Sequence, residues 1–314
     1  MIEIIKNSTF YDWENRTSIK PKGYVRVNSP TDNIVWFFGF DEQGRNTFRF
    51  DIRFSVNLLK DYSSKSIEVT NIKNVEKSSI LFTLCNQTLS DVFATLFEYL
   101  VSKIPENLII SKIPDKVFEE YGKWSKMFNR GKVGLDEIEQ RGLIGELLYI
   151  KDSVNSGLNI SDVINAWCGI DFEEVDFAFP NYWAEIKTRL STSSIIHINS
   201  VGQLDHANDG YLIIYTLSNY EEGVSLNDVY EEVHNLVENQ HNPTILSTFE
   251  ERLETYGYFK LPIYNRHHYS LTEKRIYIVN NSFPKIHRDV KTPHMKHINY
   301  SLIVDSLEEW RQRD

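Results

Sequence analysis

Residues 182–189 read YWAEIKTR, and this stretch decides how the chain is interpreted. Its composition is typical of a β-strand, yet it carries Glu185 and Lys187 two residues apart. Strand side chains alternate between faces, so both charges project from one face, roughly 6–7 Å apart. Charges on a half-buried strand are costly unless they have partners. We therefore expect this face to line a polar cleft that holds a metal ion and a phosphate; the alternative is a solvated edge strand.

The segment before this strand supplies another carboxylate. In VDFAF, residues 175–179, the alternation of side chains places Asp176 on the face opposite to the valine and the phenylalanines, and a Pro-Asn turn follows. Two antiparallel strands joined by this turn would bring Asp176 within reach of Glu185, with Lys187 beside both. Asp171 is a rival for the same role, but its segment would pair less directly with the YWAEIKTR strand.

A helix is predicted over residues 135–154, because apolar residues recur there at helical spacing. Gly142 and Gly145 lie inside it, and each glycine costs roughly 1 kcal/mol relative to alanine. We therefore expect another element to approach the helix closely at these positions. Glu146 lies beside them on the helix expected to cover the sheet, although an acidic residue on an amphipathic helix is most often solvated.

The order of elements around these residues defines the fold class. The helix is followed by strand-like pieces at 173–179, 182–188 and 194–198, a short helix at 200–208 and a buried strand at 210–217. We therefore predict a mixed α/β (α+β) fold whose core has the order αβββαβ. The predicted segments are an N-terminal β-rich domain at 1–88, a helical connector at 89–133, the core at 134–218, and a C-terminal α/β extension at 219–314.

The flanking segments show clear patterns of their own. Alternating apolar residues predict strands on both sides of the turn in residues 34–54 and a second hairpin across 66–72 and 78–85. Helical spacing predicts helices at 89–104, 225–240 and 243–257, the last two with acidic, solvated faces and with Ser225 or Asn227 and Pro243 at their starts. Two strands at 274–281 and 297–304 and a helix at 305–313 complete the chain.

Two carboxylates and a lysine that converge in this way form a hard-oxygen site suited to Mg²⁺, and Mn²⁺ can substitute. Such a metal would lower the pKa of bound water and stabilise charge at a scissile phosphate, while Lys187 could hold the attacking water. Glu-x-Lys alone is weak evidence for a metal site, because a chain of this composition would contain about one such motif by chance. The evidence here comes from the strands and the helix that surround the motif.

The phrases GLIGELL, DFAF, WAEIKT and INSVGQL together resemble the PD-(D/E)XK nuclease superfamily over about residues 135–217. The resemblance implies a restriction-endonuclease-like αβββαβ core in which Glu146, Asp176 and Glu185 hold the metal. It also implies catalytic roles for Lys187 and for Gln203, the frequent polar residue on the helix after the third strand. The family's usual proline before the aspartate is absent, because Val175 stands there; this position is commonly degenerate.

The spacing is similar to that of a bacterial family known mainly as PD-(D/E)XK motif proteins. Such proteins are often encoded beside DNA methyltransferases and helicase-like ATPases in restriction or phage-defence clusters. The resemblance therefore implies a methyltransferase or ATPase as a partner. The chain has no GxxxxGK[ST] motif, so any ATP use would belong to that partner.

Charge is distributed unevenly along the 314 residues. The formal net charge of −10 argues against non-specific coating of nucleic acid, whose affinity comes mainly from Lys and Arg. Residues 220–258 are strongly acidic, whereas residues 259–300 are basic and contain five of the nine histidines. This makes the basic stretch the best candidate for double-stranded DNA contact, the alternative being a solvated surface. The candidate contact residues are Lys274, Arg275, Lys285, Arg288, Lys291 and Lys296.

Histidines and cysteines give weaker signals. His197 is interpreted as an interior histidine, and His294 with His297 lacks a convincing third metal ligand. Cys85 and Cys168 form no CxxC pair, which disfavours disulfides and cysteine-based zinc sites. The N-terminus shows no signal pattern and no apolar run reaches the length of a membrane span, so we expect a cytoplasmic protein without membrane association.

Together these features predict a Mg²⁺-dependent DNA endonuclease of the restriction or phage-defence kind, with a homodimer favoured for double-strand cutting. The alternative from another class is a catalytically silent DNA-binding or scaffolding subunit, and a nuclease for RNA or branched DNA is a further one. The N-terminal domain could read the target, sense modification or mediate dimerisation. We expect Glu185→Ala and Lys187→Ala to abolish cleavage without unfolding, because these residues would face solvent and metal instead of the core.

Overall fold

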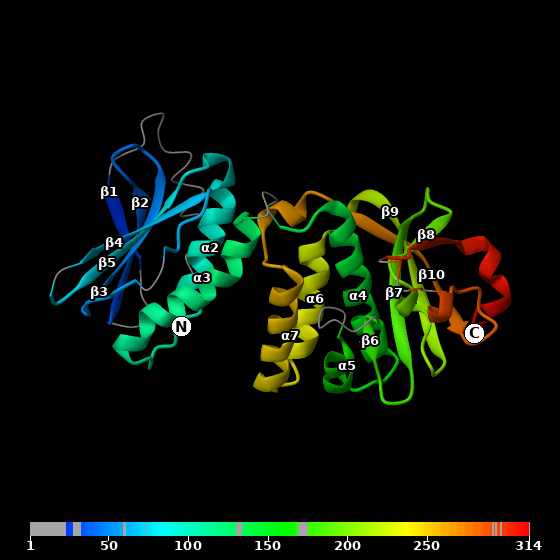
Figure 1. The fold of residues 1–314 in the computed structure, drawn as a ribbon. Coiled ribbons are helices and arrows are strands. Elements are labelled where there is room, and N and C mark those ends of the chain that lie inside the picture. The colour runs from blue at the N-terminus through cyan, green and yellow to red at the C-terminus, as the bar shows by residue number, and fades with distance from the viewer. Residues whose placement is uncertain are drawn as a thin grey trace. The chain divides into compact units, whose positions relative to one another are not determined.

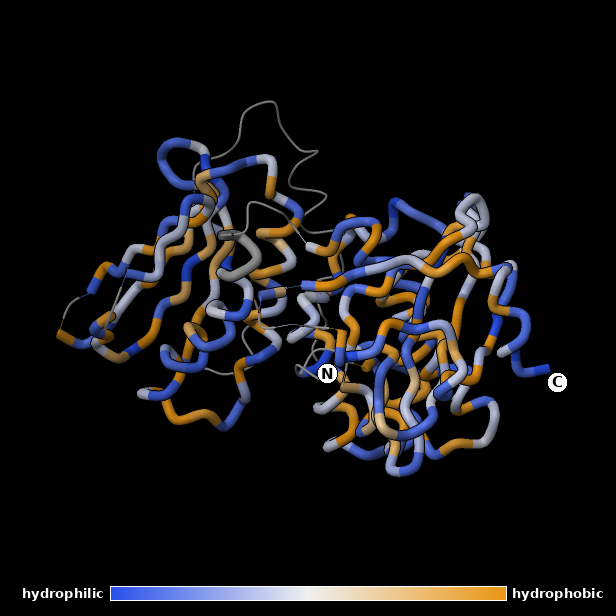
Figure 2. Tube along the Cα trace, turned by 45° about the vertical axis from the view of Figure 1, so that its right-hand side comes forward, coloured by the Kyte–Doolittle hydropathy of each residue, from blue (hydrophilic) through white to orange (hydrophobic). Residues whose placement is uncertain are grey.

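The computed structural model describes residues 23–27, 33–58, 61–73, 75–129, 134–168, 175–290, 292, 294–295 and 297–313. The chain divides into two compact units, residues 1–134 and 135–314. Within each unit, hydrophobic and hydrophilic residues are interspersed along both strands and helices (Figure 2). Among the described residues, no helix combines the length and the apolar character that crossing a membrane requires.

The first unit is built on a five-stranded antiparallel sheet of order β1-β2-β3-β5-β4 (Figure 1). Both predicted hairpins are confirmed, since β2 pairs with β3 and β4 with β5. The helices α2 and α3 belong to the same unit. The bounds are Gly23–Val27 (β1), Ile34–Phe40 (β2), Asn46–Ile52 (β3), Ile67–Lys73 (β4), Ser78–Leu84 (β5), Ser90–Ser102 (α2) and Ile113–Asn129 (α3), with 3-10 turns at Gln87–Leu89 and Ile110–Lys112.

An aromatic core joins both helices to one face of this sheet. Phe48 of β3 stacks on Phe82 of β5 with ring centroids 4.6 Å apart, and Phe93 of α2 lies 4.9 Å from Phe48. On α3, Tyr121 meets Phe82 edge-on at 5.0 Å. Such aromatic pairs bury large apolar areas and supply most of the stabilisation of a small core.

The second unit contains a mixed four-stranded sheet of order β10-β9-β7-β6 and a separate two-stranded sheet of β11 and β8. Strands β7 and β9 are parallel, whereas β6 with β7 and β9 with β10 are antiparallel. The strands are Phe177–Ala178 (β6), Trp183–Leu190 (β7), Ile195–Ile198 (β8), Gly210–Val224 (β9), Tyr269–Val279 (β10) and Tyr300–Ile303 (β11).

Helices α4 to α7 of this unit lie on one side of the sheet, and β8 with the C-terminal segment lies on the other (Figure 1). The helices are Glu137–Asn155 (α4), Ile160–Ala166 (α5), Leu226–Glu238 (α6) and Pro243–Tyr256 (α7), with 3-10 segments at Val201–Gln203 (η3), Pro262–Asn265 (η4), Arg288–Val290 (η5) and Val304–Trp310 (η6). The mixed α/β fold that the sequence predicts is confirmed.

Local capping explains where these helices begin and end. Asp136 and Glu139 form a reciprocal capping box at the start of α4, and Ser225 does the same with Asp228 at the start of α6. Pro243 occupies the first turn of α7 as predicted, and Gly257 ends that helix with a left-handed φ of 90°. Ser225, and not Asn227, is therefore the cap of α6.

Three predicted elements differ in the structure. The predicted helix at 200–208 is only the short η3, because Val201 and Leu204 supply a single apolar turn and Gly202 weakens it. The predicted C-terminal helix is the 3-10 segment η6. Strand β8 pairs with β11 and not with the main sheet, since its isoleucines pack into a core shared with β9 and the C-terminal segment, comprising among others Ile196, Ile198, Leu212, Ile214, Leu302 and Val304.

Candidate metal centre at the end of strand β6

Strand β7 places Glu185 and Lys187 on the same face, as their spacing predicts. The Lys187 Nζ atom lies 2.7 Å from Glu185 Oε1. The expectation that both side chains face solvent is wrong: Glu185 is fully buried, and only 14% of the Lys187 side chain is exposed. The reason is that β7 is an inner strand between β6 and β9, with further chain packed over its charged face.

Asp176 lies where the edge strand β6 begins. Strand β6 is only two residues long, and its Phe177 pairs with Ala184 of β7. Next to this pair, the backbone amide of Ile186 donates a hydrogen bond of 2.7 Å to Asp176 Oδ2. The aspartate side chain thus accepts the bond that a backbone carbonyl of a neighbouring strand would otherwise accept. Continuing the register by one residue places Asp176 opposite Glu185, on the same face of the sheet.

Glu146 reaches this group from α4, which packs tightly on the sheet. A Cβ atom at Gly145 would lie 2.6 Å from Thr188 Cγ2, so only glycine allows this approach; the expected close contact is confirmed there. Glu146 is buried, and its Oε2 atom accepts a hydrogen bond of 2.6 Å from Trp167 Nε1. Tyr256 on α7 is a further neighbour of Glu146, since burial and the charge of Glu146 raise the pKa of the tyrosine well above its ordinary value.

Gln203 is also brought to the site, although it lies on a 3-10 turn instead of a helix. Its Oε1 atom accepts a hydrogen bond of 3.2 Å from Lys187 Nζ and one of 2.7 Å from the backbone amide of Asn199. The second bond fixes the amide group, so Gln203 orients the lysine. Glu185, Lys187 and Gln203 are therefore in direct contact, Asp176 lies opposite Glu185, and Glu146 acts on Asp176 and Glu185 through its charge.

Electrostatic coupling shows how closely the acidic groups are gathered. Burial and the charge of Asp176 raise the pKa of Glu185 to about 8, against the opposing effect of Lys187. Burial and the charges of Asp176 and Glu185 also raise the pKa of Glu146 well above its ordinary value. Burial raises the pKa of Asp176 as well. Burial opposes charge on Lys187, but the carboxylates outweigh it and hold the pKa of Lys187 above its ordinary value.

The donor set fits a hard divalent cation. Among the described residues, neither carboxylate oxygen of Glu185 has a well-aligned hydrogen-bond partner; the contact with Lys187 is close but poorly aligned. A buried acceptor left in this way is costly unless a proton or a cation meets it. Carboxylate oxygens are the ligands that Mg²⁺ prefers. In the part of the chain that the structure describes, no group of three His, Cys, Asp or Glu side chains forms a ready metal cage.

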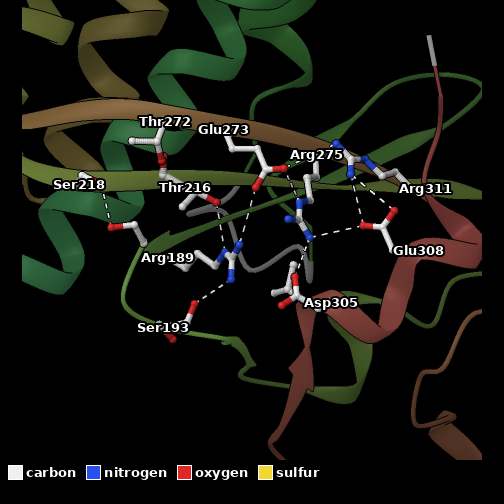
Figure 3. A network of polar contacts seen from close by, with 12 residues as sticks. Arg189, Ser193, Thr216, Ser218, Thr272, Glu273, Arg275, Asp305, Glu308 and Arg311 are labelled. Carbon is white, nitrogen blue, oxygen red and sulfur yellow. Dashed lines mark hydrogen bonds and ion pairs between the residues drawn. The ribbon is translucent and has the colours of Figure 1, made fainter.

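Each of the four candidate DNA-contact residues that the structure describes contacts an acidic side chain of the same unit. Arg275 is turned into an intramolecular network, with Glu273 at 2.6 Å and Asp305 at 2.9 Å (Figure 3). Lys274 Nζ lies 2.7 Å from Asp152 of α4. Charges paired in this way are less available to phosphates, because they would have to exchange one anion for another.

Two further candidate DNA-contact residues, Lys285 and Arg288, contact Asp205. Lys285 Nζ lies 3.5 Å from Asp205 Oδ1, and only 3% of the Lys285 side chain is exposed. Arg288 donates its backbone amide to Asp205 Oδ2 and its Nε to the Asp205 carbonyl oxygen. Lys291 and Lys296 lie outside the described residues.

The remaining candidates lie away from the site or beyond the described chain. Asp171, the rival for the metal aspartate, is outside the described residues. His197 is exposed and hydrogen-bonds Ser301 at 2.9 Å, so the expectation of an interior histidine is wrong. Its place is explained by β8, whose alternate residues bury isoleucines and turn the histidine outward. His294 and His297 are exposed.

Sequence reasoning missed two residues of the site, Trp167 and Tyr256. Trp167 follows α5, and Tyr256 is the last residue of α7, in the predicted C-terminal extension. Neither belongs to a motif, and no periodicity connects either to Glu146. The indirect signals were the two glycines of α4, since a Cβ atom at Gly142 would lie 3.3 Å from the Tyr256 hydroxyl.

Fold and site together define the class of protein. A mixed sheet with an aspartate directly before one strand, a Glu-x-Lys pair on the next, and a glutamate from the covering helix is a PD-(D/E)XK-like arrangement. A family model described as "Putative PD-(D/E)XK family member, (DUF4420)" matches residues 15–305. The chain belongs to this family. No curated protein and no solved structure matches it. The resemblance seen in the sequence is thus confirmed for the family, while the roles of individual residues stay predictions.

Proposed function

We propose that the protein is a Mg²⁺-dependent DNA endonuclease that hydrolyses phosphodiester bonds in restriction or phage defence. The observation that carries the proposal is the buried Glu185 carboxylate, which has Lys187 Nζ at 2.7 Å and whose pKa is raised by burial and by the charge of Asp176. Family membership supports a nuclease-like fold. A structural ion pair alone would not need three buried acids for one lysine.

The chain's own residues would divide the work as follows. Glu146, Asp176 and Glu185 would hold Mg²⁺ or Mn²⁺, directly or through water. When bound, the metal would supply Lewis acidity at the scissile phosphate and a lowered pKa for water. Lys187, held by the Gln203 amide, would position the attacking water and stabilise developing negative charge on the phosphate.

The remaining parts of the proposal concern substrate and partners. Double-stranded DNA is the proposed substrate, met in the cytoplasm. A homodimer would let two such centres cut both strands. A DNA methyltransferase or a helicase-like ATPase is the proposed partner in a defence system. Support for these points comes from the family resemblance.

A second function is favoured by a specific observation: each carboxylate already has a protein donor or cation. Trp167 donates to Glu146, the Ile186 amide donates to Asp176, and Lys187 contacts Glu185. A site satisfied in this way also suits a catalytically silent DNA-binding or scaffolding subunit that has kept the fold. Metal binding separates the two functions.

The test compares the wild-type protein with Glu185→Gln and Lys187→Met on unmodified and methylated genomic DNA, with and without Mg²⁺, followed by sequencing of fragment ends. We expect cleavage only with metal and a loss of at least about 100-fold in both variants, as for other groups acting at the transition state. Glu232→Gln is the matched control, because Glu232 lies on α6 with its side chain 46% exposed and pairs with Lys151.

Isothermal titration with Mn²⁺ completes the test. An active site should bind Mn²⁺ with an affinity that Asp176→Asn weakens. Cutting retained by Glu185→Gln or Lys187→Met would disprove the assignment of the site. Wild-type protein that binds DNA but neither binds Mn²⁺ nor cuts would support the silent subunit.

A further inference from the structure

Two residues that lie outside α4 and outside the family's motif residues, Trp167 and Tyr256, act on the Glu146 carboxylate. The indole Nε1 of Trp167 donates to Glu146 Oε2 at 2.6 Å, and both residues are buried. The Tyr256 hydroxyl approaches the same carboxylate from α7, and the charge of Glu146 together with burial raises the pKa of the tyrosine. A hydrogen bond to a charged acceptor is short and strong, and one from a rigid group restrains the orientation of a carboxylate.

The indole of Trp167 is itself held in place. It lies nearly parallel to Phe177 at 6.5 Å, with an interplanar angle of 17°, and 6.0 Å from Phe249 of α7. The Trp167 backbone forms a β-bridge to Phe177, directly before which Asp176 lies. The side chain is therefore packed between the helices and the strand that carries the metal aspartate, and its N–H direction is set by that packing.

Tyr256 reaches Glu146 along the surface of α4. Gly142 precedes Glu146 by four residues, so both positions are on one face of the helix. A Cβ atom at Gly142 would lie only 3.3 Å from the tyrosine hydroxyl, so the glycine leaves the space through which this hydroxyl passes. The contact joins the C-terminal helices to the candidate metal centre.

We propose that Trp167 and Tyr256 are positioning residues that orient the Glu146 carboxylate toward Asp176 and Glu185, so that a divalent cation meets it in one fixed orientation. This rests on the proposed metal site. Removal of such outer hydrogen-bond partners typically lowers metal affinity or activity about 10–100-fold. Trp167→Phe keeps the aromatic ring and removes the donor, and Tyr256→Phe removes only the hydroxyl.

The test measures Mn²⁺ affinity by titration calorimetry, thermal unfolding, and kcat and KM for DNA cleavage in the full-length variants. We expect Trp167→Phe and Tyr256→Phe each to lower Mn²⁺ affinity about 10-fold and to lower kcat while KM for DNA stays constant. Two controls lose comparable hydrogen bonds elsewhere: Tyr258→Phe, whose hydroxyl donates to Asn227 at 2.8 Å, and Trp310→Phe, whose indole donates to Ser282 at 3.0 Å. These controls should keep wild-type Mn²⁺ affinity.

Terbium gives a second readout of ion binding. Tb³⁺ is a hard, oxygen-seeking probe, and an indole adjacent to it sensitises its luminescence. Wild-type protein should give this signal on tryptophan excitation, and Tyr256→Phe and Glu146→Gln, which keep every tryptophan, should need a higher Tb³⁺ concentration to reach it, whereas Trp310→Phe should not.

The outcomes separate this inference from the proposed function. If both donor variants bind Mn²⁺ and Tb³⁺ as the wild type does, the inference is overturned even where DNA is cut. If the wild type binds Mn²⁺ without cutting DNA, and the donor variants bind it more weakly, the inference stands and the nuclease proposal fails. A wild-type protein that binds neither ion overturns both.

Discussion

Gly145 determines how closely α4 packs on β7. A Cβ atom there would lie 2.6 Å from Thr188 Cγ2 and 3.3 Å from Ile186 Cγ2. Gly145→Ala should therefore destabilise the protein by roughly 1–3 kcal/mol through overpacking, although alanine favours a helix by about 1 kcal/mol. Urea unfolding measures this change.

A matched change tests the cause. Gly145→Ala combined with Thr188→Ser removes the clashing methyl group and should recover much of the loss. Gly122→Ala in α3 meets no atom within 4 Å and should leave stability unchanged or raise it by up to about 1 kcal/mol. If the Gly145→Ala variant is as stable as the wild type, α4 does not pack on β7 as closely as inferred.

At the scale of single residues, the relative placement of Asp176, Glu185 and Lys187 could be predicted because their relation is local. Glu185 and Lys187 share a strand face, and Asp176 is one short turn away, so period and turn chemistry suffice. Trp167 and Tyr256 could not be predicted, because their contacts with Glu146 depend on how three helices pack. The burial of Glu185 was missed for the same reason: what covers β7 comes from the distant end of the chain.

Helix α3 carries a buried carboxylate that makes stability depend on pH. Glu120 is 2% exposed and contacts Lys116 at 2.7 Å, Lys123 at 2.9 Å and the Tyr99 hydroxyl at 2.6 Å. Burial alone would raise the pKa of Glu120, but these partners lower it to about 2. Because the folded pKa lies below the unfolded value of about 4.5, this group stabilises the fold above that pH, and its contribution is lost as pH falls toward about 2.

Glu120→Gln should thus cost roughly 1–3 kcal/mol at pH 7 and progressively less between pH 4.5 and 2, as judged by urea unfolding at several pH values. Glu119→Gln is the control, since Glu119 pairs with the same Lys116 but its side chain is 61% exposed; it should change little. A difference between wild type and Glu120→Gln that does not vary with pH would contradict the charge argument.

Arg275 of β10 ties the sheet to η6. Its side chain is 15% exposed and pairs with Glu273, Asp305 and Glu308 (Figure 3). Arg275→Met should destabilise the unit by about 1 kcal/mol and speed hydrogen exchange in η6, because the exposed acids Asp305 and Glu308 lose the cation that links them to β10. If this arginine instead served DNA, the variant would lose DNA affinity while exchange in η6 stayed at the wild-type rate.

At the scale of elements, helices with strong caps were predicted close to their true ends, as α6 and α7 show. Which strands pair with each other was harder to predict from the sequence. Strand β8 has the right residues for a strand but not for a choice of partner, since isoleucines pack equally well in either sheet. The choice depends on β11, roughly a hundred residues later in the chain.

For the whole molecule, every residue of the candidate site lies in the second unit, 135–314. That unit has its own mixed sheet and its own buried core. A fragment of residues 135–314 should therefore unfold cooperatively and bind Mn²⁺ with the affinity of the full chain. Calorimetry of both proteins tests this; a fragment without a cooperative transition would show that the first unit is needed for folding.

The contact between Tyr256 and Glu146 spans 110 positions of the chain and has a consequence for biosynthesis. Translation proceeds from the N-terminus, so a nascent polypeptide that has emerged only as far as β9 already carries the acids and the lysine but lacks the tyrosine that restrains one of them. The centre reaches its final form only when α7 has left the ribosome and docked. Truncated translation products should therefore hold divalent ions weakly, which would keep unfinished chains inert.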